Sequence, residues 1–351
     1  MLIKEIHIEN VRNLQNVTIE PDEAINYFYG KNAAGKTALL EAIFLLARAK
    51  SFRTPRIREI ITKNEKKLCI TAKLKDHNDD PSSIGIEYDQ KETRLKYRNN
   101  KVRKISEQAK NLPLFLFTPD SQRILTGRPK ERRNWLDWAL FHVEHTYIDI
   151  WKDYHKALRQ RNKLLRLDRP ISEILPWEKE IAKFGNQLEQ SRGNYLSELQ
   201  NLICKGLNQF SGETSIEYSG VSGDLLEYLV ANREKDRELG TTQTGPHRAE
   251  VKFQINGKNA AKILSRGQIK LYTATVILGQ TAHYMGMNNE KPILLVDDIA
   301  AELDDDNREN LIQQLSALGI QIFINATGKN VFENQRQKRM FHVKQGMIIA
   351  V

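Results

Sequence analysis

A glycine-rich segment early in the chain has the residue types and spacing of a phosphate-binding loop. It matches the pattern G-x-x-x-x-G-K-[ST] and consists of Gly30, Lys31, Asn32, Ala33, Ala34, Gly35, Lys36 and Thr37. Glycines let the backbone curl so that successive N–H groups face a phosphate, and the start of a following helix adds positive potential. In such a loop we expect the Lys36 ammonium to reach the β- and γ-phosphates and the Thr37 hydroxyl to bind Mg²⁺.

Two acids follow a short apolar run much later in the chain. The run 293–296 predicts a buried strand, and Asp297 and Asp298 come directly after it. Asp297 could hold Mg²⁺ opposite Thr37, and Asp298 could polarise the attacking water. Acids at strand ends are common, so this pair indicates a Mg²⁺ and water-activating site only in combination with the phosphate-binding loop. Together the two motifs predict a hydrolytic site in which Asp298 and Lys36 are the catalytic groups.

A third motif precedes a segment rich in helix formers. Leu264-Ser265-Arg266-Gly267-Gln268 is followed by a predicted helix from Ile269 to about Met285. Ser265 has the residue type of a helix N-cap, and its hydroxyl and the following amides could bind an anion. An ordinary capped helix would have the same pattern. In combination with the other two motifs, Ser265, Gly267 and Gln268 become candidate nucleotide contacts.

The elements that must position these motifs alternate between strands and helices. An apolar run at 25–29 followed by helical apolar density at 38–47 places the phosphate loop between a strand and a helix. Residues 68–105 alternate in polarity and contain turn residues, so an antiparallel β region is expected there. Further short strands are predicted at 3–8, 17–19, 114–117, 251–255, 293–296 and 322–324. This pattern predicts an α/β fold with a mixed or parallel sheet core and an antiparallel β region.

The middle of the chain has a different periodicity. Aromatic and leucine residues recur at steps of three to four between about 121 and 240, and Pro170 and Pro176 are expected to break the helical pattern. We therefore expect an inserted helical lobe at 118–240. The segments 1–117 and 241–351 would then form one discontinuous ATPase lobe.

The charge composition indicates which kind of partner the protein could bind. The 351 residues include 54 Lys and Arg against 44 Asp and Glu, a net charge of +10. A basic protein commonly binds nucleic acid, although charge alone does not establish it. Eight cations and two acids fall in each of the windows 48–67 and 91–110. Solvated surface would account equally well for either window alone.

Cysteine content and hydropathy indicate the cellular compartment of the protein. Two cysteines, Cys69 and Cys204, cannot form a disulfide framework or a four-cysteine zinc site. No apolar run approaches the 18 residues typical of a membrane span, and the first eight residues contain charges where a signal peptide would be apolar. We expect a cytoplasmic protein without a membrane partner.

The order of these motifs resembles the ABC-type ATPase heads, and further segments resemble the RecF family of bacterial recombination mediators. The family likeness includes Lys50-Ser51-Phe52-Arg53, Gly127-Arg128-Pro129 with Arg132-Arg133, and Thr244-Gly245-Pro246-His247-Arg248. The chain departs from the family pattern at Ala38, Ala249 and Ile269. A transporter-like switch histidine is absent after Ile324, where Asn325 and Thr327 stand.

The resemblance implies ATP and Mg²⁺ as cofactors and an ATP-dependent homodimer. In ABC heads, the signature motif and the helix that follows it in one subunit cover the ATP held by the other subunit. The signature motif of this chain would be 264–268, so Ser265 and Gly267 would contact the ATP of the partner subunit. The protein would be a weak DNA-dependent ATPase that acts as a switch, and hydrolysis would reset the dimer. Hydrolysis is expected to be slow because the Asp298 side chain is one methylene shorter than the glutamate common in transporters.

The resemblance also implies a role in gap repair and replication restart. The protein would bind double-stranded DNA near junctions with single-stranded gaps and assist RecA loading with RecR and RecO. The basic windows supply candidate DNA contacts, which are Arg53, Arg56, Arg58, Lys96, Lys101, Arg103 and Lys104. Two alternatives are a structural ATPase head of the SMC or Rad50 kind and a transporter ATPase subunit. The former carries far longer coiled coils, and the latter has its loop and signature closer together in sequence.

Overall fold

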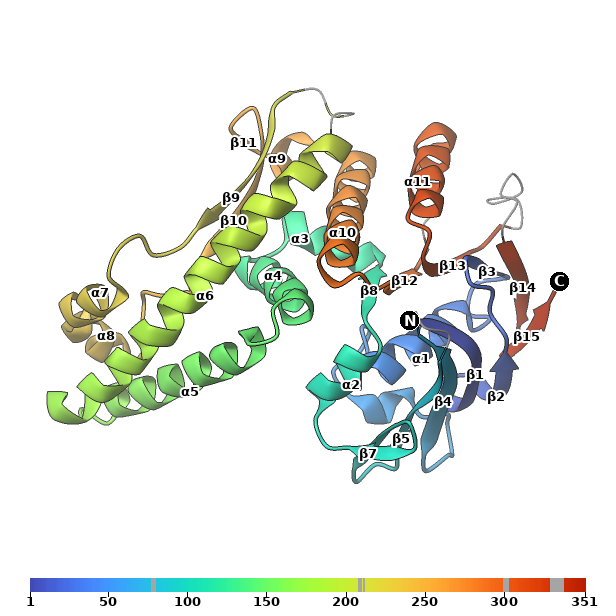
Figure 1. The fold of residues 1–351 in the computed structure, drawn as a ribbon, viewed down its shortest axis with the longest axis horizontal. Helices are drawn as coiled ribbons and strands as arrows, with labels where there is room; N and C mark the ends of the chain where they lie inside the picture. The colour runs from blue at the N-terminus through green and yellow to red at the C-terminus, as the bar shows by residue number, and fades with distance from the viewer. Residues whose placement is uncertain (77–79, 208–209, 211, 299–302, 329–337) are drawn as a thin grey trace. The chain divides into compact units, whose positions relative to one another are not determined.

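The structure is a computed structural model that describes residues 1–76, 80–207, 210, 212–298, 303–328 and 338–351 (Figure 1). The chain forms two compact units, Met1–Ser121 with Val276–Val351, and Gln122–Thr275. This division assigns residues 241–275 to the second unit, whereas the sequence pattern grouped them with the ATPase lobe. The reason is that the strand expected at 251–255 pairs with a strand of the second unit.

An antiparallel sheet forms one layer of the first unit, in the order β2-β1-β4-β5-β6-β7. Its strands are β1 (Leu2–Val11), β2 (Leu14–Ile19), β4 (Leu68–Lys75), β5 (Pro81–Tyr88), β6 (Thr93–Tyr97) and β7 (Asn100–Val102). Ile3, Ile6 and Ile8 are all buried although Ile3 and Ile6 are three residues apart. A register shift between Ile3 and Glu5 explains this, because a bulge changes the face that the following residues take.

A mixed sheet forms the other layer, in the order β15-β14-β3-β13-β12-β8. Its strands are β3 (Ile25–Tyr29), β8 (Leu114–Phe117), β12 (Ile293–Val296), β13 (Gln321–Ala326), β14 (Lys338–Lys344) and β15 (Met347–Ala350). All neighbours are parallel except β14 and β15. Every residue of β12 and β13 is buried, as expected for parallel strands covered on both faces. The predicted α/β class is confirmed.

Helix α1 (Lys36–Arg48) contributes to one core with both sheets. Nearly all its residues are buried, and they share an apolar cluster with side chains of the antiparallel sheet and with Phe28, Leu295 and Phe323 of the mixed sheet. Other elements of this unit are η1 (Ile57–Ile60), α2 (Ile105–Asn111), η2 (Pro119–Gln122, which reaches the unit boundary) and α11 (Asp305–Ala317). The phosphate loop therefore leaves a central parallel strand and enters a helix that is fixed on all sides.

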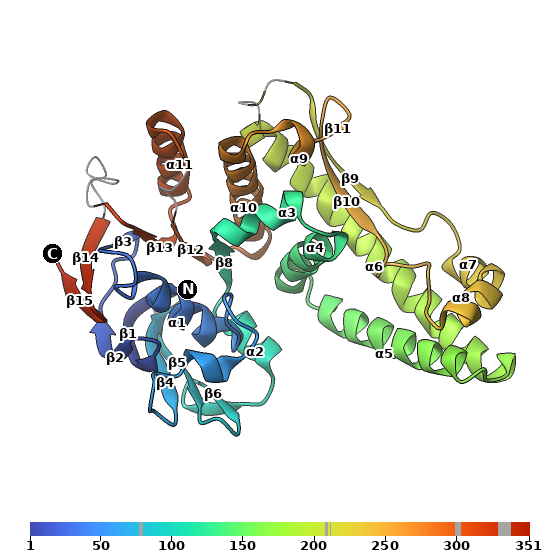
Figure 2. The same cartoon turned by 180° about the vertical axis from the view of Figure 1, so that it is seen from behind.

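The second unit is mainly helical (Figure 2). Its helices are α3 (Arg123–Thr126), α4 (Pro129–Val143), α5 (Tyr147–Arg166), α6 (Ile171–Gly206), α7 (Leu225–Ala231), α8 (Arg233–Leu239) and α9 (Ala260–Ile263). The long helices α5 and α6 pack together as predicted, and Pro170 is the N-cap of α6. Pro176 was expected to break the chain but lies inside α6. At this sixth residue of the helix, proline has no N–H to donate to the carbonyl of residue 172, so α6 continues through Pro176 with one backbone hydrogen bond fewer.

A small antiparallel sheet lies within this helical unit; its strand at 251–255 was predicted, but the two strands beside it were not. It has the order β11-β10-β9 and contains β9 (Thr214–Ser219), β10 (Glu250–Ile255) and β11 (Lys258–Asn259). Helix α10 (Arg266–Asn288) begins in the second unit and continues into the first. Among the described residues, no helix is long and apolar enough to cross a membrane.

Candidate functional site

The phosphate loop has the backbone conformation that its glycines permit. Gly30 and Gly35 have φ angles of 156° and 119°. A Cβ atom at Gly30 would lie 2.2 Å from the Val343 carbonyl oxygen, so a larger residue would displace β14. Ala33 also has a positive φ, 62°. The loop thus places residues 30–37 between β3 and α1, as the sequence predicted.

The Lys36 side chain turns back over the loop. Its Nζ donates hydrogen bonds to the carbonyl oxygens of Gly30 at 2.6 Å and Lys31 at 2.9 Å. Burial lowers the pKa of Lys36, whereas Asp298 and Asp297 raise it. A buried ammonium held by carbonyl dipoles retains a strong attraction for an anion. Lys36 is therefore poised to exchange these carbonyls for phosphate oxygens.

Thr37 and Asp297 meet as the sequence pattern predicted. The Thr37 hydroxyl donates to Asp297 Oδ1 at 2.9 Å, although the two residues are 260 positions apart. Burial raises the pKa of Asp297, and hydrogen bonds from Asn325 and Thr37 oppose that shift. A hydroxyl beside a buried carboxylate is the donor set that Mg²⁺ favours in phosphate sites, so these residues fit that ion.

Asn325 fixes both acids and was not predicted as a site residue. Its Nδ2 donates to Asp297 Oδ1 at 2.5 Å, and its Oδ1 accepts from the Asp298 backbone N–H at 2.7 Å. Asp298 has φ 52°, an uncommon conformation for a residue other than glycine. Asn325 is the penultimate residue of strand β13, which lies between β12 and the strand of the phosphate loop. The available signal was that Asn325 directly follows the apolar run 322–324, because the carboxyl ends of parallel strands lie at one edge of a sheet.

These residues surround a cavity of about 530 Å³ in the first unit. It is lined by Arg12, Asn13, Asn32, Ala33, Gly35, Lys36, Thr37, Ala38, Arg53, Asp298, Asn325 and Thr327. Asn13 is a further unpredicted member, and its Nδ2 donates to the Ala34 carbonyl at 3.0 Å. Six cationic or amide side chains in the lining give it donors suited to an anion; they are Arg12, Asn13, Asn32, Lys36, Arg53 and Asn325.

Glu41 holds the two arginines of this cavity. It is fully buried on α1, and both of its oxygens accept from the Arg12 guanidinium, at 2.9 and 3.0 Å. Arg53 lies 3.9 Å from the same carboxylate, and the Ser51 hydroxyl also donates to it. Arg53, a candidate DNA contact, therefore lines the phosphate cavity. No sequence motif linked Arg12 to this site, because Arg12 lies in the turn between β1 and β2, well before the loop.

The signature motif lies in the second unit. Ser265 and Gln268 cap α10 reciprocally: the Gln268 N–H donates to Ser265 Oγ at 3.3 Å, and the Ser265 N–H donates to Gln268 Oε1 at 2.9 Å. Ser265 and Gln268 are exposed, and Gly267 is half-buried. The predicted N-cap is confirmed, and the helix end is accessible to a ligand.

The remaining DNA-contact candidates are exposed on the first unit. Arg56 has an 80% exposed side chain and lies 3.6 Å from Glu59, and Arg58 is also exposed. Lys96 and Lys101 lie directly opposite each other on β6 and β7, which is unfavourable for like charges. Arg103 and Lys104 follow β7 and are exposed as well. Asp298 is followed in the sequence by the acidic segment Glu302-Leu303-Asp304, in which Glu302 lies outside the described residues and Asp304 caps α11.

The sequence matches the protein family described as RecF/RecN/SMC N terminal domain over residues 2–349. Fold and cavity thus define an ABC-type ATPase head of that class. The chain is 36% identical to the DNA replication and repair protein RecF of Stutzerimonas stutzeri, over 99% of this chain and 97% of the relative. The chain belongs to the RecF family.

Solved structures agree with this assignment. The structure described as the recombination mediator protein RecF-ATP in the RecFOR pathway has a TM-score of 0.90 and 28% identity, covering 99% of this chain and 97% of its own. An Smc head domain derived from Pyrococcus furiosus has a TM-score of 0.60 and 16% identity, over 99% and 95% of the two chains. The Smc head shares the fold alone.

Proposed function

We propose that the protein is an ATP-dependent DNA-binding recombination mediator. The observation that carries this proposal is the contact of Thr37 with Asp297 beside a loop of phosphate-binding conformation. Relatives named for DNA replication and repair, which match the chain over nearly its full length, support the DNA-directed part. The solved RecF relative whose description includes ATP supports the choice of nucleotide.

The nucleotide would bind in the cavity of the first unit, with its phosphates against the backbone of residues 30–37. Lys36 and the N-terminus of α1 would neutralise phosphate charge, and Thr37 with Asp297 would hold Mg²⁺. Asp298 would orient the attacking water, with Lys36 stabilising the charge that develops. Arg12 and Arg53, held by Glu41, add positive charge along the cavity wall.

The homodimer is part of the same proposal. Ser265, Gly267 and Gln268 present an exposed helix start that could meet the γ-phosphate held by a second copy of the chain. A triphosphate between two positive helix ends attracts both, and a diphosphate lacks that bridge. Nucleotide state would thereby control dimerisation, and slow hydrolysis supported by Asp298 would reset it.

The DNA-directed role would follow from the dimer. We propose binding to double-stranded DNA near junctions with single-stranded gaps, in the cytoplasm, and assistance to RecA loading with RecR and RecO. The exposed cations Arg56, Arg58, Lys96 and Lys101, with Arg103 and Lys104, would contact phosphates without reading sequence. A transporter subunit or an SMC-like structural head has no comparable support from the RecF relatives.

Fluorescence anisotropy with a labelled gapped duplex tests this function. Binding is expected with ATP and Mg²⁺ and not with ADP. Lys36→Met should abolish the ATP effect because the loop loses the buried ammonium that lies over its carbonyl groups. Lys50→Met, at an exposed position just beyond α1, is the matched control. DNA binding that is equally tight with ATP, with ADP and without nucleotide would contradict the proposal.

A further inference from the structure

Helix α5 carries a row of cations that none of the candidate sites above includes. Lysine or arginine recurs along it at steps of four, three, four and three residues, at Lys152, Lys156, Arg159, Lys163 and Arg166. Steps of three and four keep side chains on one face of a helix. All five side chains are exposed. We refer to these five residues as the α5 row.

The opposite face of the helix does the packing. Tyr154, Leu158, Arg161 and Leu165 are buried, and they fall on the side of α5 away from the row. Helix α6 packs against α5 along this side (Figures 1 and 2). The α5 row therefore lies on the face of the helix that is turned away from the packing with α6.

The row is poor in compensating acids. Lys152 lies 3.2 Å from Asp149, but within the described part of the chain the other four cations form no ion pair. Residues 154–166 contain no Asp or Glu. Like charges three or four residues apart on a helix repel each other. The row is therefore unfavourable in the isolated protein and favourable once an anion lies along it.

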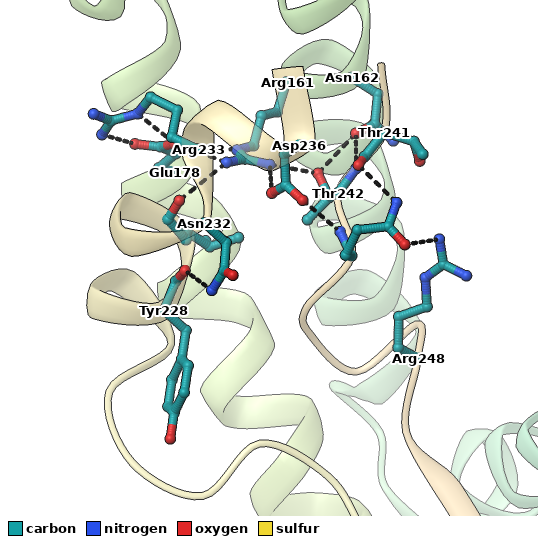
Figure 3. A network of polar contacts seen from close by, with 12 residues as sticks. Arg161, Asn162, Glu178, Tyr228, Asn232, Arg233, Asp236, Thr241, Thr242 and Arg248 are labelled. Carbon is teal, nitrogen blue, oxygen red and sulfur yellow. Dashed lines mark hydrogen bonds and ion pairs between the residues drawn. The ribbon is translucent and has the colours of Figure 1, made fainter. Parts of the chain in front are cut away.

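A buried network keeps α5 in a fixed position (Figure 3). Arg161 donates to Glu178 of α6 at 3.0 Å, to Asp236 of α8 at 2.7 Å and to the Thr242 hydroxyl at 2.7 Å. Arg233 completes the network with a 2.6 Å contact to Glu178. The two cations and two acids of the network cancel, so the network adds no net charge. Because the network holds α5 in place, the α5 row needs little reordering when it binds a ligand.

We propose that the α5 row binds the phosphate backbone of duplex DNA, which adds a contact on the second unit to the DNA-binding function proposed above and rests on it. From Lys152 to Arg166 the helix rises about 21 Å, at 1.5 Å per residue. That length corresponds to roughly six base-pair steps of 3.4 Å. The other exposed residues of α5 are Asp149, Asp153 and Gln160. This face of the helix thus lacks the aromatic and aliphatic anchors that dominate protein–protein interfaces, which favours phosphates over an acidic protein surface.

Charge neutralisation of the row tests the proposal in the full-length protein. The variant combines Lys156→Gln, Arg159→Gln and Lys163→Gln, since glutamine preserves helix propensity. The control combines Lys179→Gln, Lys235→Gln and Lys258→Gln, which removes the same charge from exposed positions of the same unit. Anisotropy on the gapped duplex with ATP is measured over a series of salt concentrations, with polyglutamate as a second anionic probe.

The row variant is expected to bind DNA about tenfold or more weakly, with a slope of log K against log salt lower by about 2–3. Its ATP binding and melting temperature should match those of the control. Equal DNA affinity and equal salt slope in the two variants would overturn this inference but not the proposed function. A loss of affinity for polyglutamate without a loss of affinity for DNA would overturn it as well. Absence of DNA binding by the unmodified protein would instead overturn the proposed function.

Discussion

Replacement of Asn325 by alanine should loosen the end of the sheet that holds both acids. The amide is 2% exposed and makes two hydrogen bonds, one to the Asp297 carboxylate and one from the Asp298 N–H. A hydrogen bond to a charged group contributes roughly 1.5–3 kcal/mol, and a buried N–H left without a partner costs about 1–3 kcal/mol. Since the two effects share one side chain, we expect Asn325→Ala to lower the free energy of unfolding by about 2–4 kcal/mol.

The assay is thermal and urea unfolding, followed by circular dichroism. For a unit of this size, a change of 1 kcal/mol shifts the melting temperature by roughly 2–4 °C, so a loss of about 5–15 °C is expected. Asn16→Ala, at an exposed position of β2 in the same unit, should change the free energy by less than about 0.5 kcal/mol. An Asn325→Ala protein as stable as the Asn16→Ala control would refute the reasoning.

The buried network of the second unit and a buried histidine give two further predictions. Arg161→Met should destabilise the protein by about 3–5 kcal/mol, because it leaves buried Asp236 without its Arg161 partner and buried Glu178 with Arg233 alone. The measurement is urea unfolding against the exposed Arg159→Met control, and a loss below about 1 kcal/mol would contradict this. Burial lowers the pKa of His247 to about 4, so the unfolded chain takes up its proton first and stability falls as the pH drops from 6.5 toward 4. His247→Gln should reduce that loss in melting temperature, and an unchanged pH profile would show that other groups cause it.

Local sequence patterns were sufficient for the phosphate loop and its flanking elements. The strand at 25–29, the helix after the loop and the acids after 293–296 all lie where periodicity and motif placed them. These features depend on neighbouring residues, and the glycine positions leave few conformations for the loop. The contact of Thr37 with Asp297 agrees with the expectation, from the two motifs, that these residues hold Mg²⁺ from opposite sides.

Features that depend on residues distant in sequence were not predictable in the same way. Asn325 reaches the site because β13 lies between β12 and β3, and strand order is not contained in local periodicity. Glu41 positions Arg12 and Arg53. The sequence pattern around Glu41 predicted only that this residue lies in a helix. The strand β9 went unpredicted because its register partner, β10, follows about thirty residues later.

The central claim is that bound ATP joins two copies of the chain through the phosphate loop of one and the signature helix of the other. Sedimentation velocity with ATP, with ADP and without nucleotide measures this directly, at a protein concentration where the nucleotide-free chain is monomeric. The account predicts a dimer with ATP and Mg²⁺ only, and loss of that dimer in Ser265→Arg, which places a bulky side chain at the exposed helix start while leaving the cavity unchanged. A monomer under all three conditions, or a dimer that Ser265→Arg leaves intact, would contradict the account.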